Sequence, residues 1–227
     1  MDKKSFTDIL FFSLIFTLVI LPPLFVKNAT PETFTVWSFP FQQIIYAYIA
    51  GMIFWSFYTK SSQKGKSDKT VKNIRFFINS GYTLVTFGLL CTIAAITELF
   101  SHLTGLHPSV IPVRPASVVQ YLYCILDFVA ASFFEEVLYR LYLPDMLFRF
   151  ISHISLPAFL SSEIISESTV VIIFAFSHRY LGTASVINAA IACVILRICC
   201  KKSGSVWTNT TAHFAYNILS LILLTTT

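Results

Sequence analysis

Apolar stretches long enough to cross a membrane recur along the whole chain. Of its 227 residues, 56% are hydrophobic and only 12% are charged. A bilayer core needs about 20 mostly apolar residues per helix, and the sequence supplies seven candidates: residues 6–26, 40–59, 74–100, 117–143, 167–181, 183–200 and 205–224. Lipid offers the backbone no hydrogen-bond partners, so each span is expected to be helical. We predict one membrane-embedded domain over residues 1–227, an all-α polytopic transmembrane bundle of about seven spans.

The basic residues indicate how the bundle is oriented. Lys and Arg near the ends of spans are retained on the cytoplasmic side, and most of them lie in alternate connections: Lys3, Lys4, Lys60, Lys64, Lys66, Lys69, Lys72, Arg75, Arg149, Arg197, Lys201 and Lys202. This pattern predicts a cytoplasmic N-terminus. It also explains the net charge of +5 without nucleic-acid binding. Residues 144–166, between the fourth and fifth spans, are expected to form one or two short helices near the interface.

Three polar clusters stand inside the later apolar spans: Glu135, Glu136 and Arg140; Phe174 and His178; and His213 and Asn217. A charged side chain at the bilayer centre costs about 2.5–3.5 kcal/mol on insertion scales, so such residues are usually paired or functional. At about 1.5 Å per residue, Glu135 and His213 each lie roughly 12 Å from the cytoplasmic end of their span, and His178 roughly 16 Å. The clusters are therefore expected at one depth, in the cytoplasmic half of the membrane.

Helical spacing divides the two neighbouring glutamates. Glu136 and Arg140 are four residues apart and can form an ion pair on one face, whereas Glu135 is rotated by about 100° and lacks that partner. Each cluster alone also has a plain structural explanation. Glu135 can extend toward water at the membrane edge, His178 can be a packing residue, and His213 and Asn217 can bond neighbouring helices.

The clusters together contain the groups needed to hydrolyse an amide. Glu135 can act as general base toward a water molecule that His178 also holds. His213 and Asn217, one helical turn apart, offer hydrogen bonds to the oxyanion of a tetrahedral intermediate. Glu136, Arg140 and Phe174 are assigned supporting roles.

The ordered motifs resemble the signature of the CAAX protease and bacteriocin-processing family, also called the Abi family. The resemblance rests on Glu135-Glu136-x-x-x-Arg140, Phe174-x-x-x-His178 and His213-x-x-x-Asn217, within residues 117–224. It implies a glutamic intramembrane endopeptidase without a cofactor, in which Glu135 and His178 activate water and His213 and Asn217 form the oxyanion site. The chain departs from many members at Leu141, where they have glycine.

Two other functions remain open at this stage. A zinc protease would use Glu135 or Glu136 with His178 and His213, but no helix carries H-E-x-x-H, and the five cysteines contain no C-x-x-C pair. We therefore expect no metal site. The other alternative is a non-catalytic membrane scaffold or bacteriocin-immunity factor, which would bind peptides with the same donors and leave them uncut.

The expected partners are the lipid bilayer and a hydrophobic or lipidated peptide substrate. The resemblance permits either prenylated C-terminal tails or peptide precursors such as bacteriocins. The short chain favours a bacterial cytoplasmic membrane over the endoplasmic reticulum.

Overall fold

A computed structural model describes residues 3–25, 38–61, 69–106, 114–155, 157 and 161–226. These residues contain helices and connections but no strand, so the all-α prediction is confirmed. The helices are α1 (Lys3–Ile15), η1 (Phe16–Ile20), α2 (Leu21–Phe25), α3 (Phe41–Ser61), α4 (Lys69–Thr104), α5 (Val118–Glu136), η3 (Val137–Tyr142), α6 (Leu143–Ile151), α7 (Ser162–Ser177), η4 (Arg179–Leu181), α8 (Thr183–Ser203) and α9 (Val206–Thr226).

Four helical stretches within the described residues are long and apolar enough to cross a membrane. They are Asp8–Phe25, Arg75–Thr104, Val118–Ile151 and Thr183–Ser203. The chain is therefore a multi-pass membrane protein. The count of seven spans and the cytoplasmic N-terminus stay predictions. Two of the basic residues on which the predicted orientation rests, Lys64 and Lys66, lie outside the described residues.

The fourth apolar segment is longer than the sequence predicted. The helical path of α5 continues through the π-helical turn η3 into α6, which ends at Ile151. Pro144 does not stop it because this residue lies in the first turn of α6, where a missing N–H is tolerated. The expected short helices over residues 144–166 are thus replaced by the end of this long helix and the start of α7. Ser161 caps α7, its hydroxyl accepting a hydrogen bond from the Ile164 amide at 3.1 Å.

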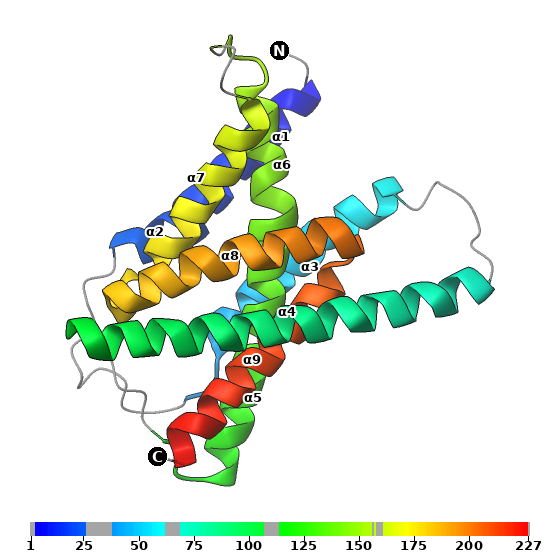
Figure 1. The fold of residues 1–227 in the computed structure, drawn as a ribbon. Helices are drawn as coiled ribbons and strands as arrows, with labels where there is room; N and C mark the ends of the chain where they lie inside the picture. Colours follow the sequence, from blue (N-terminus) through cyan, green and yellow to red (C-terminus); the bar gives the residue numbers. More distant parts are fainter. Residues whose placement is uncertain are drawn as a thin grey trace.

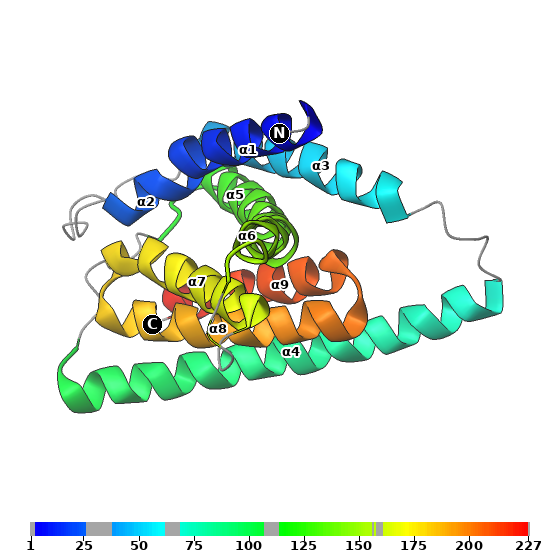
Figure 2. The same ribbon diagram turned by 90° about the horizontal axis from the view of Figure 1, so that it is seen from above.

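The long helix of α5, η3 and α6 forms the centre of the bundle (Figures 1 and 2). α5 packs against α3 and α9, α6 packs against α7, and α8 packs against α4 and α7. The apolar core includes Val137, Leu138 and Leu143, each at most 1% exposed. At the same level the core also contains a charged pair, Glu136 and Arg140, both at 0% exposed.

Candidate active site

A cavity of about 380 Å³ lies between α5, α7, α8 and α9. Its lining includes four residues selected from the sequence, Glu135, His178, His213 and Asn217, together with Phe174. The structure thus brings these side chains together from three separate helices, α5, α7 and α9. Glu136 and Arg140 do not line the cavity but are buried behind it.

The ion pair predicted between Glu136 and Arg140 is present. Arg140 Nε lies 3.2 Å from Glu136 Oε2, and both side chains are inaccessible to solvent. Arg140 also directs Nη1 to Cys193 Sγ at 3.1 Å, and its guanidinium carbon lies 4.7 Å from the centre of the Phe174 ring. A buried charge requires such compensation, so Arg140 serves as the counter-ion of the site.

Glu136 is held by side chains from two helical segments, η3 and α9, rather than by Arg140 alone. Asn209 Nδ2 donates to Glu136 Oε2 at 3.0 Å, and His213 Nδ1 lies 3.0 Å from Glu136 Oε1. Asn209 Nδ2 also bonds the Leu196 carbonyl oxygen at 2.6 Å. The sequence motifs gave Asn209 no role. Its four-residue spacing from His213 was the signal that could have found it, because that spacing places both side chains on one face of α9.

The contact with Glu136 determines how the His213 ring can be used. A carboxylate only accepts hydrogen bonds, so Nδ1 must carry the proton in this contact. The other ring nitrogen, Nε2, lies 3.9 Å from Glu135 Oε2. His213 is thus placed between two glutamates, one buried and paired, the other lining the cavity.

Glu135 is the less constrained of the two carboxylates. Among the described residues, its Oε2 atom has no hydrogen-bond partner although it is buried. Its side chain is 22% exposed, whereas that of Glu136 is 0% exposed. The predicted separation of the two glutamates, one paired with Arg140 and one not, is confirmed by these contacts.

His178 lies at the C-terminal end of α7 and is oriented by its own helix. Its Nδ1 lies 2.8 Å from the Phe174 carbonyl oxygen and therefore carries the proton, since a carbonyl cannot donate. Nε2 is left for the cavity that His178 lines. The Phe174 ring packs between Tyr139, at 4.9 Å from ring centre to ring centre, and His178, at 4.7 Å.

Asn217 is the last of the selected residues. Its Nδ2 donates to Ser132 Oγ at 3.3 Å, a long hydrogen bond that ties α9 to α5. One amide hydrogen remains for a ligand because the NH₂ group has two.

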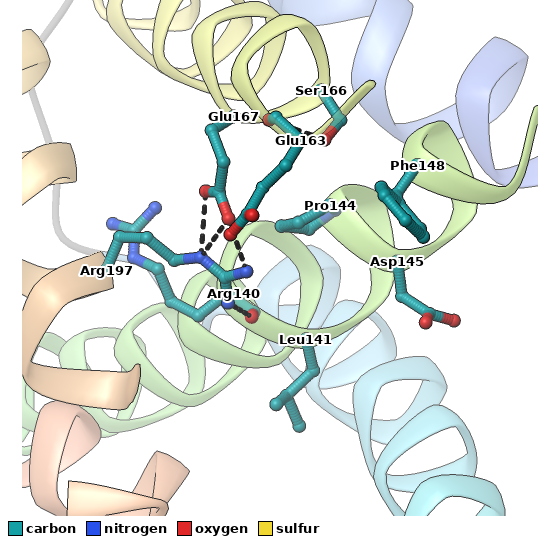
Figure 3. Close-up of a pocket in the computed structure, with 9 residues that line it drawn as sticks. All are labelled: Arg140, Leu141, Pro144, Asp145, Phe148, Glu163, Ser166, Glu167 and Arg197. Carbon is teal, nitrogen blue, oxygen red and sulfur yellow. Dashed lines mark hydrogen bonds and ion pairs between the residues drawn. The ribbon is translucent and has the colours of Figure 1, made fainter. Parts of the chain in front are cut away.

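A second group of charged side chains supports the helix turn that carries Arg140. In a π-helical turn each backbone hydrogen bond spans five residues instead of the four of an α-helix. Within this turn the Arg140 carbonyl accepts a hydrogen bond from Arg197 Nη1 of α8. Glu167 of α7 holds Arg197 in turn, with contacts of 2.9, 2.8 and 2.6 Å. Figure 3 shows Arg197 between the Glu167 carboxylate and the Arg140 backbone. We call Glu167, Arg197 and the Arg140 carbonyl the π-turn clamp.

No group of three or more His, Cys, Asp or Glu side chains in the described part of the chain has the arrangement of a metal site. The zinc alternative therefore lacks a preformed ligand set among these residues.

The fold and the cavity define a polytopic helical membrane protein with a polar site enclosed between its helices. Residues 117–219 match a family model described as type II CAAX prenyl endopeptidase Rce1-like. This stretch contains every site residue described above, so the resemblance seen in the motifs is confirmed. The family supports an intramembrane endopeptidase of the CAAX type. Comparison with curated proteins and with solved structures gave no match.

Proposed function

We propose that this protein is a glutamic intramembrane endopeptidase that hydrolyses a peptide bond of a membrane-associated or lipidated peptide. The observation that carries the proposal is the position of Glu135. This carboxylate is not paired with Arg140, lies 3.9 Å from His213 Nε2, and shares its cavity with His178. A carboxylate without an arginine partner, close to one histidine and in the same cavity as another, is suited to proton transfer.

In the proposed reaction, Glu135 removes a proton from a water molecule that His178 Nε2 also contacts. The water oxygen forms a bond to the substrate carbonyl carbon, and the carbonyl oxygen becomes negative. Glu135 then delivers the proton to the amide nitrogen as the carbon–nitrogen bond breaks. The negative oxygen forms the carbonyl again as this bond breaks, so one water is consumed and a carboxylic acid and an amine are released.

His213 and Asn217 hold the negative oxygen in this scheme. Because His213 Nδ1 donates to Glu136, Nε2 can donate only from the doubly protonated ring. The carboxylates of Glu135 and Glu136 flank this cationic ring on both sides. Asn217 supplies its remaining amide hydrogen. Removing one such donor typically lowers the rate by about 10² to 10³.

Glu136, Arg140 and Asn209 act by positioning. Glu136 fixes the His213 ring, while Arg140 and Asn209 supply the hydrogen bonds and the charge that keep the Glu136 carboxylate ionised in the core. Phe174 packs against both Arg140 and His178 and sets their separation.

We place the reaction at the cytoplasmic side of the membrane, and in a bacterial cytoplasmic membrane. The basic residues at the ends of the spans support this orientation through the positive-inside rule. The substrate reaches the cavity along the bilayer plane, as expected for a hydrophobic or lipid-anchored peptide. Prenylated C-terminal tails and bacteriocin-like precursors both fit this description.

The test compares membrane peptides from cells that carry the wild type, Glu135→Gln or a control variant, Glu163→Gln. Glu163 lies at the start of α7 and pairs with Lys201, away from the cavity. The proposal predicts peptides that are present with the wild type and with Glu163→Gln and missing with Glu135→Gln. Identical peptides in all three strains would instead favour the scaffold or immunity factor.

A further inference from the structure

The cavity contains a second carboxylate that the proposed reaction does not use. Asp127 lies on α5 and lines the same cavity as Glu135. The two residues are separated by eight positions, so they lie about 12 Å apart along the helix. Ala131, midway between them, also lines the cavity. Its small side chain leaves the face between the two carboxylates open.

Asp127 has no counter-ion in the described part of the chain. No hydrogen bond or ion pair joins it to a described residue, and the described residues that line the cavity include neither Lys nor Arg. Asp127 is half-buried, and an ionised carboxylate that is partly removed from water without a partner is unfavourable. The position therefore favours a cationic group brought in from outside.

A second acceptor without a partner belongs to another helix that lines the cavity. Asn188 of α8 directs Nδ2 to the Tyr216 hydroxyl at 3.5 Å, which leaves its side-chain oxygen buried without a hydrogen-bond partner in the described structure. Asn188 and Tyr216 both line the cavity. An ammonium or guanidinium group carries several hydrogen-bond donors and no acceptor, so it can satisfy both a carboxylate and an amide oxygen.

We propose that Asp127 is a specificity residue that binds a Lys or Arg side chain of the substrate, three or four residues from the bond that is cut. This inference rests on the proposed protease function. The spacing follows from the distance to Glu135, because an extended peptide advances about 3.3 Å per residue.

The test maps newly formed protein termini in membranes from cells that carry the wild type, Glu135→Gln, Asp127→Asn or Asp127→Lys. Only termini that are missing with Glu135→Gln are counted. Among these cut sites in the wild type, the frequency of Lys or Arg three or four residues from the cut should be at least threefold above background. With Asp127→Asn the enrichment should disappear while cutting at other sequences continues. With Asp127→Lys, Asp or Glu should be enriched there instead.

A measurement on the wild type alone guards against variants that fail to fold. The purified protein in lipid vesicles is given three peptides that share the sequence of one mapped cut site and differ by Lys, Gln or Glu at the predicted position. The Lys peptide should have a KM at least tenfold lower than the Glu peptide. Equal KM values for the three peptides would overturn the role of Asp127, and so would an unchanged enrichment with Asp127→Asn. Neither result would affect the proposed protease function. The absence of any Glu135-dependent terminus would overturn the protease function itself.

Discussion

His213 Nδ1 lies 3.0 Å from Oε1 of the buried Glu136. The contact requires a proton on Nδ1, and the second ring nitrogen, Nε2, lies on the side of Glu135. A buried carboxylate that orients a working histidine is a familiar arrangement in hydrolases. The two adjacent glutamates thus have different environments, and each can be tested separately.

Replacing Glu136 with Gln is expected to damage the fold. The amide has nearly the shape of the carboxylate but leaves Arg140 without its counter-charge, and breaking one half of a buried ion pair typically costs about 3–5 kcal/mol. We expect a clear fall in the unfolding temperature in detergent, together with loss of cleavage. Glu135→Gln, one residue away, should unfold within a few degrees of the wild type. Equal stability of the two variants would contradict the assignment of Glu136.

Asn209 is expected to matter although no motif singled it out. Asn209→Ala removes the hydrogen bonds to Glu136 and to the Leu196 carbonyl, and losing hydrogen bonds to buried acceptors costs about 1–3 kcal/mol. Cleavage should fall because Glu136, and through it His213, loses a constraint. Thr211→Ala on the same helix is the control, since its exposed hydroxyl bonds only the Trp207 carbonyl. If both variants behave alike, Asn209 has no special role.

The π-turn clamp predicts unequal effects of two nearby glutamates on α7. Glu167→Gln weakens the hold on Arg197, and charge-assisted hydrogen bonds of this kind contribute about 1.5–3 kcal/mol. Glu163→Gln removes a more exposed pair with Lys201, which contributes under about 1 kcal/mol. Thermal unfolding and cleavage should therefore both fall more with Glu167→Gln. A variant in which the two residues are swapped, Glu167→Arg with Arg197→Glu, should not regain activity. Its arginine would lie on α7 and could not donate to the Arg140 carbonyl as Arg197 of α8 does.

Metal removal provides an independent test of the reaction type. In the proposed scheme a carboxylate activates the water, so cleavage by the purified protein should persist after prolonged treatment with a strong chelator. The measurement is the initial rate on one membrane peptide before and after treatment. Loss of activity that returns on adding Zn²⁺ would support the zinc alternative, with Glu135, His178 and His213 as ligands.

The sequence could predict which side chains meet in the cavity because helix geometry determines depth and face. A rise of about 1.5 Å per residue brought Glu135, His178 and His213 to one level, and the spacing of four paired Glu136 with Arg140. It did not predict the partners contributed by neighbouring helices. The bonds from Asn209 to Glu136 and from Arg197 to the Arg140 carbonyl depend on how α8 and α9 pack against the central helix.

The sequence pattern also did not predict that the central helix continues past Pro144 to Ile151. Pro144 usually indicates the end of a helix, yet here it follows a π-helical turn and lies where its missing N–H is tolerated. Within this turn the Arg140 carbonyl accepts a hydrogen bond from Arg197 of another helix. No local spacing of apolar residues records it.

The most direct test of the central claim is whether Glu135 activates water. The purified wild type and Glu135→Gln would be compared in lipid vesicles on one mapped substrate peptide, in water enriched in ¹⁸O, with the rate and the isotope content of the new carboxyl group measured. The account predicts one ¹⁸O atom per cleaved bond with the wild type and a rate about 10² to 10⁴ lower with a folded Glu135→Gln variant. A variant that cleaves within tenfold of the wild type would contradict it.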